Sequence, residues 1–222
     1  MKTSIVRIYT QDAQVPSYKS AGASGFDLRV KYTENRIVLS KYAINTLLHN
    51  GVSTYPAPIV SLYYELYNLT YKPISCENFI AAIDRAIDDF HHENRVNIID
   101  YMNDNNLDYI NFVPPQSSVV LKTGLHMEIP EDLELQIRPR SGISAKTMLQ
   151  VALGTVDSDY RGEIGIIVQN PSNYAYIIPP GMRLAQGVIV EKYQASFVEV
   201  ESLNCLEKTN RGSGGFGSTG NN

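Results

Sequence analysis

The stretch LELQIRPRSG, at residues 133–142, alternates apolar and polar side chains and then ends in Arg-Pro-Arg-Ser-Gly. Strict alternation is typical of a β-strand that buries one of its faces. Comparable short stretches lie on both sides of it, separated at close spacing by turns rich in Pro, Gly and Asn. This spacing predicts an all-β sandwich or barrel. The strands that we expect lie at residues 4–9, 26–30, 118–121, 126–129, 133–138, 165–169, 175–178, 186–190 and 195–200.

Residues 33–112 differ from the rest of the chain in charge and in periodicity. They carry ten acidic and five basic residues, whereas the remainder carries thirteen and fourteen. Apolar side chains recur at helical spacing from Phe79 to Phe90, after Ser75, a residue type that caps helix N-termini. The same spacing predicts a second helix at residues 59–66. We therefore expect an inserted, acidic and mainly helical module in an all-β protein.

The chain is thus expected to divide into three parts. Residues 1–32 and 113–208 form the β core, and residues 33–112 form the inserted module. Residues 209–222 contain too many glycines to fold alone, so we expect a flexible arm that becomes ordered only on a ligand.

The overall composition excludes several classes of protein. Of the 222 residues, 43% are hydrophobic and 19% are charged, as in ordinary folded chains, and the net charge of −4 does not favour nucleic-acid binding. No apolar run is long enough to cross a membrane, and MKTSIVRIYT lacks the apolar stretch of a secretory signal. We expect an intracellular, cytoplasmic protein, or a host-cell location if the source is viral. Neither the two cysteines nor the four histidines have the spacing of a metal site.

A polar turn, GTVDSDYRGEIG at residues 154–165, separates two predicted strands. A carboxylate held near a phosphate can orient and deprotonate a water molecule, and the turn offers both Asp157 and Asp159 for this task. The ring of Tyr160 can pack against a sugar, and the flanking glycines leave backbone groups accessible to the edge of a base. Taken alone, the pattern also fits an ordinary surface hairpin.

Two further segments carry groups that suit phosphates. Arg138 and Arg140 place guanidinium groups beside a serine at a strand end, and arginine forks bind phosphate oxygens in pairs. The tail RGSGGFGSTG, at residues 211–220, offers unobstructed backbone N–H groups and the charge of Arg211. Its single aromatic residue, Phe216, suits stacking on a flat base. Taken alone, these segments also fit a strand-ending turn and a disordered tail.

Five segments together, in this order, resemble the five motifs of the trimeric dUTPases (deoxyuridine 5′-triphosphate nucleotidohydrolases). The resemblance leaves out only residues 33–112, which look like a large insertion between the first and second motifs. It implies a jelly-roll-like β sandwich or barrel that forms a homotrimer with its active sites at the subunit interfaces. The five segments are AGASGFDL at 21–28, RPRSG at 138–142, GTVDSDYRGEIG at 154–165, GMRLAQ at 181–186 and RGSGGFGSTG at 211–220.

The activity that the resemblance implies is the Mg²⁺-dependent hydrolysis of dUTP to dUMP and pyrophosphate. This reaction limits uracil incorporation into DNA and supplies dUMP for dTTP synthesis. Asp157 matches the family's catalytic acid, which positions the water that attacks the α-phosphorus. Tyr160 matches the residue that stacks on the sugar and leaves no room for a 2′-hydroxyl. Asp27 matches an acid that reaches the metal at most through water, because the triphosphate itself holds the Mg²⁺.

The substrate-binding residues that the resemblance implies form three groups. Backbone groups that read uracil are those of Gly154, Thr155, Val156 and Gly165. Residues of a neighbouring subunit that bind phosphates are Arg140, Ser141, Gly142 and Gln186. Residues of the arm that close over the active site, with Phe216 covering uracil, are Arg211, Phe216, Gly217, Ser218 and Thr219.

Two other functions remain open at this point. A dCTP deaminase shares the implied fold and binds a similar nucleotide, although the third and fifth motifs favour the hydrolase. Alternatively, residues 33–112 give a dUTPase scaffold a regulatory role by binding a protein partner. The lead-in LQVAL at residues 149–153 also departs from the family's more polar pattern, so a side-chain contact made there by some relatives is not expected here.

We predict that truncation after Lys208 leaves a folded trimer without most of its dUTP hydrolysis, because the arm supplies Arg211 and Phe216. Size-exclusion chromatography and a pyrophosphate-release assay check both parts. Deletion of Asn221 and Asn222 alone, which lie beyond the motif, is the matched control. Full activity after the longer truncation would show that the fifth motif is dispensable.

Overall fold

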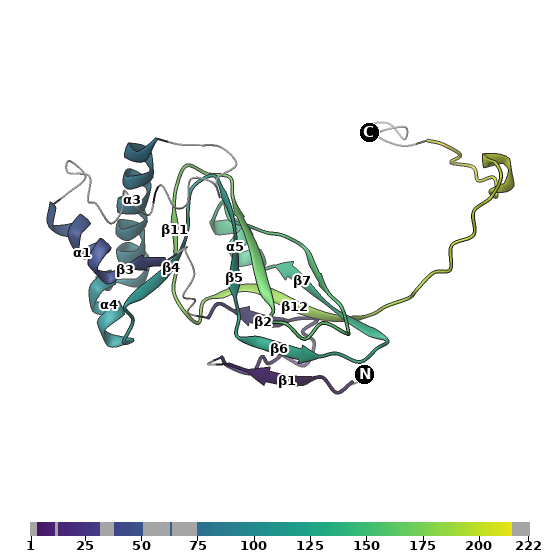
Figure 1. The fold of residues 1–222 in the computed structure, drawn as a ribbon, viewed down its shortest axis with the longest axis horizontal. Helices are drawn as coiled ribbons and strands as arrows, with labels where there is room; N and C mark the ends of the chain where they lie inside the picture. The colour runs from purple at the N-terminus through teal and green to yellow at the C-terminus, as the bar shows by residue number, and fades with distance from the viewer. Residues whose placement is uncertain (1–3, 12, 32–37, 51–62, 64–74, 215–222) are drawn as a thin grey trace. The chain divides into compact units, whose positions relative to one another are not determined.

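A computed structural model describes residues 4–11, 13–31, 38–50, 63 and 75–214 (Figure 1). The chain separates into two compact units, residues 1–192 and residues 193–222. The first unit holds all of the named strands, and the second holds a single short 3₁₀ turn among its described residues, Leu203–Cys205.

Antiparallel strands dominate the first unit, as the alternating patterns predict. They form four sheets with the orders β1-β6, β5-β10-β8, β11-β4-β3 and β2-β12-β7-β9. The all-β prediction is therefore confirmed. The strands are β1 (Arg7–Thr10), β2 (Phe26–Arg29), β3 (Val38–Ser40), β4 (Tyr109–Val113), β5 (Ser117–Lys122), β6 (Leu125–Glu128), β7 (Leu133–Pro139), β8 (Gln150–Val151), β9 (Gly154–Val156), β10 (Gly165–Asn170), β11 (Tyr176–Ile178) and β12 (Arg183–Glu191).

The predicted strand at residues 195–200 is wrong for the single chain. Within the described residues of the second unit no strand forms, and the side chains of Phe197 and Val198 are 94% and 85% exposed. Alternation of apolar and polar residues signals a strand only if another strand supplies hydrogen-bond partners. The sequence pattern also does not predict the strands β3, β4, β8 and β9. β3, β8 and β9 have only two or three residues, and β4 is buried at four successive positions, so that it shows no alternation.

The four-stranded sheet β2-β12-β7-β9 shows why its strands form. In β7, the side chains of Leu133, Leu135 and Ile137 are buried, whereas the residues between them are partly exposed. The neighbouring β12 places Gly187 opposite Ile137 and Phe26, and a Cβ atom at Gly187 would come within 2.7 Å of the Phe26 ring. A glycine at this position therefore lets a large aromatic ring fill the core beside the central strand pair.

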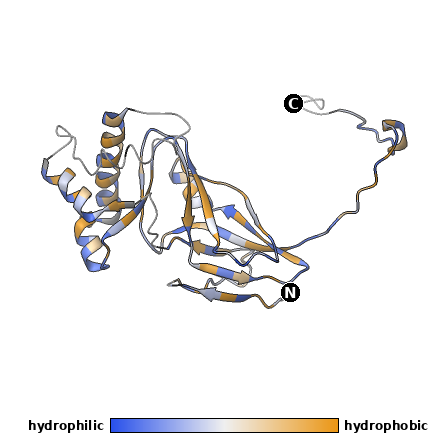
Figure 2. Cartoon of the chain, viewed as in Figure 1, coloured by the Kyte–Doolittle hydropathy of each residue, from blue (hydrophilic) through white to orange (hydrophobic). Residues whose placement is uncertain are grey.

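The helix predicted after Ser75 is confirmed as α3 (Cys76–Asn94). The Ser75 hydroxyl accepts a hydrogen bond from the Asn78 N–H, and the helix ends where Arg95 adopts a left-handed φ of 55°. The apolar face from Phe79 to Phe90 is buried, and both apolar and polar residues are visible along the helix in Figure 2. The other helices are α1 (Lys41–Asn50), α4 (Ile98–Asp104) and α5 (Ser141–Lys146).

The second predicted helix, at residues 59–66, lies outside the described residues except for Tyr63. This residue is helical, and its ring packs against Phe79 at a centroid distance of 5.5 Å. No helix among the described residues is both long and apolar enough to cross a membrane.

The helices of residues 33–112 share one hydrophobic core with the strands. The Phe79 ring of α3 lies 6.5 Å from the Phe112 ring of β4, and the Arg85 guanidinium lies 3.9 Å above the Tyr174 ring. In Figure 1, α1, α3 and α4 gather beside the sheet β11-β4-β3. Burial raises the pKa of the Asp84 carboxyl on α3, and the nearby charge of Asp88 raises it further. The boundaries of the module stay a prediction.

The two ends of the helical segment lie next to each other. Ser40 is paired with Tyr109 in the register of β3 and β4, and the Lys41 N–H donates to the Asp108 carbonyl at 2.8 Å. The chain thus leaves the sheet and returns to it at adjacent positions. A long connection between adjacent ends costs little extra free energy, about 0.6 kcal/mol per doubling of its length.

We predict that replacing residues 41–108 by Asn-Gly, a two-residue hairpin turn, preserves trimer formation and dUTP hydrolysis within about tenfold. The predicted site residues all lie outside the deleted segment. A lower thermal midpoint is expected because Phe112 loses its cover. The Phe79→Ala variant of the full chain is the control for lost packing alone. A folded variant that is monomeric or inactive would place the segment in the subunit interface or in the site.

Candidate active site

The turn between β9 and β10 presents Asp157 and Asp159 at the surface. The Tyr160 N–H donates to the Asp157 carbonyl at 3.1 Å, which closes the turn. Beside it, Ser158 is buried, and its hydroxyl accepts a hydrogen bond of 2.6 Å from the Lys192 ammonium. The Arg161 guanidinium donates to the carbonyl oxygens of Ser158 and Tyr160. Hydrogen bonds from Tyr160, Arg161 and Lys192 therefore fix the backbone of the turn that carries both carboxylates.

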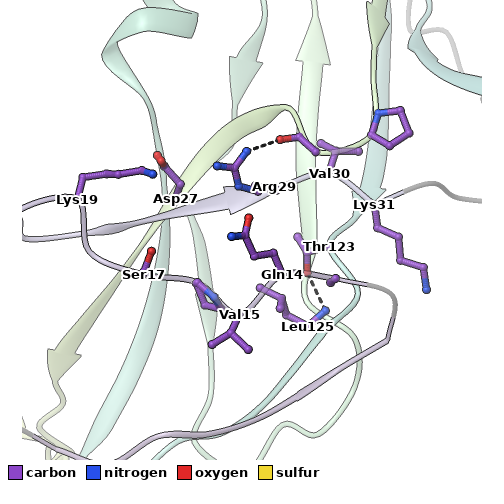
Figure 3. Close-up of a pocket in the computed structure, with 14 residues that line it drawn as sticks. Gln14, Val15, Ser17, Lys19, Asp27, Arg29, Val30, Lys31, Thr123 and Leu125 are labelled. Carbon is purple, nitrogen blue, oxygen red and sulfur yellow. Dashed lines mark hydrogen bonds between the residues drawn. The ribbon is translucent and has the colours of Figure 1, made fainter. Parts of the chain in front are cut away.

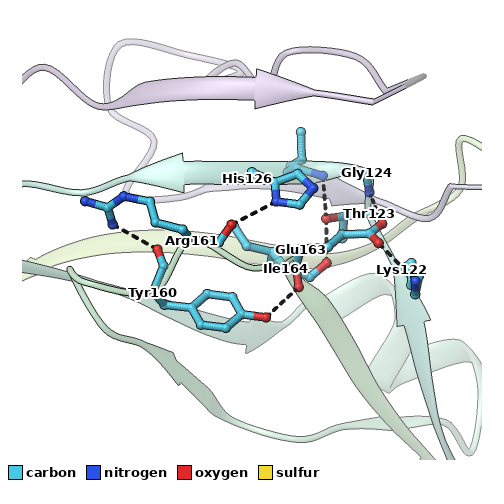
Figure 4. Close-up of polar contacts among 9 residues, drawn as sticks. Lys122, Thr123, Gly124, His126, Tyr160, Arg161, Glu163 and Ile164 are labelled. Carbon is cyan, nitrogen blue, oxygen red and sulfur yellow. Dashed lines mark hydrogen bonds and ion pairs between the residues drawn. The ribbon is translucent and has the colours of Figure 1, made fainter.

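Tyr160 lies on the same turn with its ring partly open to solvent. Its hydroxyl donates to the Glu163 carbonyl at 3.1 Å (Figure 4), and 46% of the residue is exposed. The ring thus has a defined direction and an accessible surface. Such a ring can stack on a flat group or on a sugar.

Three of the four predicted uracil-reading residues lie on an edge strand. Gly154, Thr155 and Val156 form β9, which pairs with β7 and ends the order of its sheet. An edge strand presents outward N–H and C=O groups, which match the donors and acceptors of a base edge. Gly165 begins β10 opposite Lys122, and a Cβ atom there would come within 2.6 Å of the Val120 side chain. A side chain at position 165 would therefore force the Val120 side chain to move.

Arg140, one of the predicted phosphate-binding residues, contacts Asp27, which lies on β2. The Arg140 Nε lies 2.9 Å from one carboxylate oxygen of Asp27, and the Arg183 Nη1 lies 3.3 Å from the other. Arg140 also donates to the Arg183 carbonyl at 2.8 Å. The Asp27 side chain is only 13% exposed, so one shielded carboxylate holds two guanidinium groups in place. A contact between Asp27 and the Mg²⁺ hydration shell stays a prediction.

The other members of this group lie nearby. Gln186 is paired with both Asp27 and Arg138 across β12, and its amide donates to the Pro139 carbonyl at 2.9 Å. Ser141 and Gly142 are exposed at the start of α5. Arg138 differs from Arg140, because its guanidinium donates to the Gln136 side chain. The sequence alone treats these two arginines alike.

A pocket of about 320 Å³ opens beside Asp27 (Figure 3). Lys19, Arg29 and Lys31 line it together with Asp27, and Arg29 donates to the Gly181 carbonyl at 2.7 Å. Three cationic side chains beside one carboxylate suit an anionic ligand. The pocket therefore extends the cationic region that begins at Arg140.

The two groups of residues lie at opposite ends of β7. Asp157 follows Val156, which is paired with Leu135, whereas Arg140 follows the last residue of β7. Five residues of extended chain from Leu135 to Arg140 span roughly 16 Å. Within one chain, the Asp157 carboxylate and the arginine cluster at Arg140 therefore lie too far apart to contact the same atom.

The arm is described only in part. The Arg211 Nε donates to the Gly214 carbonyl at 2.8 Å within the second unit. Phe216, Gly217, Ser218 and Thr219 lie outside the described residues. Within the described part of the chain, no group of three His, Cys, Asp or Glu residues could hold a metal ion by itself.

The sequence alone did not predict three residues whose hydrogen bonds stabilise the turn at residues 154–165, namely Ser158, Lys192 and Glu163. Each acts through a partner distant in the chain: Lys192 lies 34 residues from Ser158, and Glu163 lies 39 residues from Gly124. Local patterns carry no signal for such pairs. Arg183, which lies in the motif at residues 181–186, forms an ion pair with Asp27 and so has a structural role in the free chain.

A family model described as dUTPase matches residues 106–220. The deoxyuridine 5′-triphosphate nucleotidohydrolase of Roseobacter denitrificans is 48% identical over 108 residues, which cover 48% of this chain and 69% of the relative. The enzyme of the same name from Fusobacterium nucleatum is 51% identical over 105 residues, or 46% and 69% of the two chains. The chain belongs to the dUTPase family. The matched range of this dUTPase chain begins inside the predicted module and contains every predicted site residue except Asp27.

Solved structures support the same fold for the dUTPase chain. A mutant of the Staphylococcus bacteriophage 80alpha dUTPase with dUpNHpp has a TM-score of 0.58 at 18% identity and covers 98% of this chain and 99% of its own. The dUTPase from phage phi11 of S. aureus, whose species-specific insert has been visualised, has a TM-score of 0.53 at 16% identity, with coverage of 91% and 100%. At these identities the likeness concerns the fold alone, which is the antiparallel β fold of dUTPases.

We predict that Asp27→Ala lowers the free energy of unfolding by roughly 1–3 kcal/mol, since two guanidinium groups lose a common acceptor whose side chain is only 13% exposed. Glu128→Ala is the matched control. Its ion pair with Arg7 is 3.0 Å long but has 79% and 48% exposed side chains, and such exposed pairs contribute about 1 kcal/mol or less. Urea unfolding of both variants makes the comparison. Equal losses would mean that the Asp27 cluster is no more than a surface contact.

Proposed function

We propose that this chain hydrolyses dUTP to dUMP and pyrophosphate in active sites that three identical subunits share. The observation that carries the proposal is the turn of residues 154–165, where an exposed Asp157 and an oriented Tyr160 lie within the range matched by the dUTPase family. Relatives that are 46% identical over 110 residues and 51% identical over 105 residues are named for the same hydrolysis.

In the proposed reaction, Asp157 accepts a proton from the water that attacks the α-phosphorus, and pyrophosphate leaves. Its position supports this role, because a general base must reach the substrate while its backbone is held in place. Asp157 is exposed, and hydrogen bonds from Arg161 and Lys192 hold the turn that carries it. Tyr160 stacks on the deoxyribose and blocks a 2′-hydroxyl. The backbone of Gly154, Thr155 and Val156 on the edge strand hydrogen-bonds to uracil, with Gly165 beside it.

The triphosphate is proposed to bind at the arginine cluster. Arg140 is held by Asp27 and can still offer donors to phosphate, and Gln186, Ser141 and Gly142 lie nearby. The arm, with Arg211, Phe216, Gly217, Ser218 and Thr219, is proposed to close over the bound nucleotide. Mg²⁺ carried by the triphosphate neutralises phosphate charge when bound, and it needs few protein ligands because it keeps several waters. Asp27 would meet it at most through water.

Two observations support an assembly of several subunits, which we propose to be a homotrimer. First, Asp157 and the Arg140 cluster lie at opposite ends of β7, so that a complete site needs a second subunit. Second, Phe197 and Val198 are 94% and 85% exposed in the single chain, which suits burial against a neighbouring subunit. We propose that the assembled enzyme acts in the cytoplasm, or in the host cell if the source is viral, where it limits uracil incorporation into DNA and supplies dUMP.

A second role, binding of a protein partner by residues 33–112, is proposed for the helical segment. Its support is the exposed acidic surface of α3, which includes Asp88, Asp89 and Glu93. A phage relative of similar fold is described as controlling the transfer of virulence genes, which is a property of that protein. The match to the dUTPase family favours hydrolysis over the deaminase alternative.

We predict that Asp157→Asn lowers kcat for dUTP by roughly 10²-fold or more, since general base catalysis contributes about 10²–10⁴. Asp159→Asn, on the same exposed turn, is the matched control and should retain most activity. Pyrophosphate release with dUTP, UTP, dCTP and dTTP side by side gives the measurement, and only dUTP should be turned over efficiently. A larger loss in the Asp159 variant would move the role of base to that residue.

A further inference from the structure

The direction of the Tyr160 ring is set within its own turn. The phenol hydroxyl donates to the Glu163 carbonyl at 3.1 Å (Figure 4). The ring also lies where a side chain at residue 162 would be, because a Cβ atom on Gly162 would overlap the phenol. The hydrogen bond of the hydroxyl therefore holds the ring, and Gly162 leaves the space that the ring occupies, while 46% of Tyr160 stays exposed.

The acceptor of this hydrogen bond is anchored from the opposite side by the Glu163 side chain. One carboxylate oxygen accepts the Gly124 N–H at 2.8 Å, and the other lies 3.2 Å from the Lys122 ammonium. The Glu163 side chain is only 16% exposed. The next residue, Ile164, adds two backbone links, since its N–H donates to the Leu125 carbonyl and its carbonyl accepts the Thr123 hydroxyl.

The anchor itself has little freedom to move. Gly124 has a φ of 70°, and a Cβ atom there would come within 2.5 Å of the Gln11 carbonyl oxygen. The Gly124 carbonyl in turn accepts the Gln11 N–H at 2.8 Å. Gly124 is buried, so its N–H depends on the Glu163 carboxylate as its acceptor. The carboxylate thus joins the Tyr160 turn to a fixed point on the β5–β6 connection.

We propose that Glu163 is a positioning residue for sugar selection: by anchoring the carbonyl that holds the Tyr160 hydroxyl, it sets the ring against the 2′ position of the nucleotide. The inference rests on the proposed role of Tyr160 at the sugar. Exclusion of one hydroxyl group depends on a displacement of about 1 Å, and a shift of that size in a positioned group is enough to change rates by about 10²-fold. A ring that is free to tilt would admit the ribonucleotide.

The test measures kcat and KM for dUTP and for UTP in Glu163→Ala and in the conservative control Glu163→Gln. In Glu163→Ala, the ratio of kcat/KM for dUTP to that for UTP should fall at least about tenfold. Glu163→Gln should stay within about twofold of the unchanged chain, because an amide oxygen still accepts the Gly124 N–H. Lys122→Ala, which removes only the ion pair, should also leave the ratio unchanged.

A merely structural role would lower the thermal midpoint of Glu163→Ala without changing the nucleotide ratio, and that result would overturn the proposal. If Glu163→Ala does not fold, Glu163→Asp decides the question. Its shorter side chain does not reach the Gly124 N–H in the same way, so its ratio should fall, and an unchanged ratio would also overturn the proposal.

Tyr160→Ala separates this inference from the function on which it rests. A lowered ratio in Tyr160→Ala with an unchanged ratio in Glu163→Ala would overturn only the role of Glu163. Unchanged ratios in both variants would overturn the sugar-stacking role of Tyr160 as well. Lowered ratios in both, with Glu163→Gln unaffected, are the expected result.

Discussion

The pairing of β7 with β12 is the interaction on which the rest of this structure depends. It continues for seven residue pairs, from Leu133 with Glu191 to Pro139 with Ala185. Because Leu135 and Ile137 point into the core, a slip of one residue would turn these side chains to the solvent. The register is therefore determined by burial, and it fixes the positions of β2 and β9, the strands that flank this pair and carry Asp27 and the predicted uracil-reading residues.

This register separates the predicted site residues into two groups with different chemistry. At one end of β7, the edge strand β9 leads into a turn that presents Asp157 and Tyr160. At the other end, β2 and β12 bring Asp27 to the guanidinium groups of Arg140 and Arg183. The arginine cluster that we propose to bind phosphates and the carboxylate that we propose to activate water are thereby kept apart in a single chain.

The helical segment is attached to this frame through packing as well as through its two ends. The Phe79 ring meets Phe112 on β4, and Arg85 lies over Tyr174, so the segment covers one face of the sheet β11-β4-β3. Its ends meet at the bond from Lys41 to Asp108. The exposed acidic residues of α3 therefore lie on a helix that packs against the sheet, whereas the predicted nucleotide-binding residues lie outside the segment.

The sequence by itself determined the local elements and the family. Alternating residues predicted the longer strands, Ser75 and the apolar spacing predicted α3, and five motifs in order pointed to the dUTPases. Only the tertiary structure decided that Asp27 forms ion pairs with both Arg140 and Arg183. It also decided that Lys192 donates a hydrogen bond to Ser158 and that Glu163 accepts one from Gly124. Within the described part of the chain, it left residues 195–200 without a strand partner. The physical reason is the distance along the sequence over which each interaction acts. Periodicity and capping act over a few residues, whereas these contacts join residues 34 to 156 positions apart and exist only once the strand registers are set.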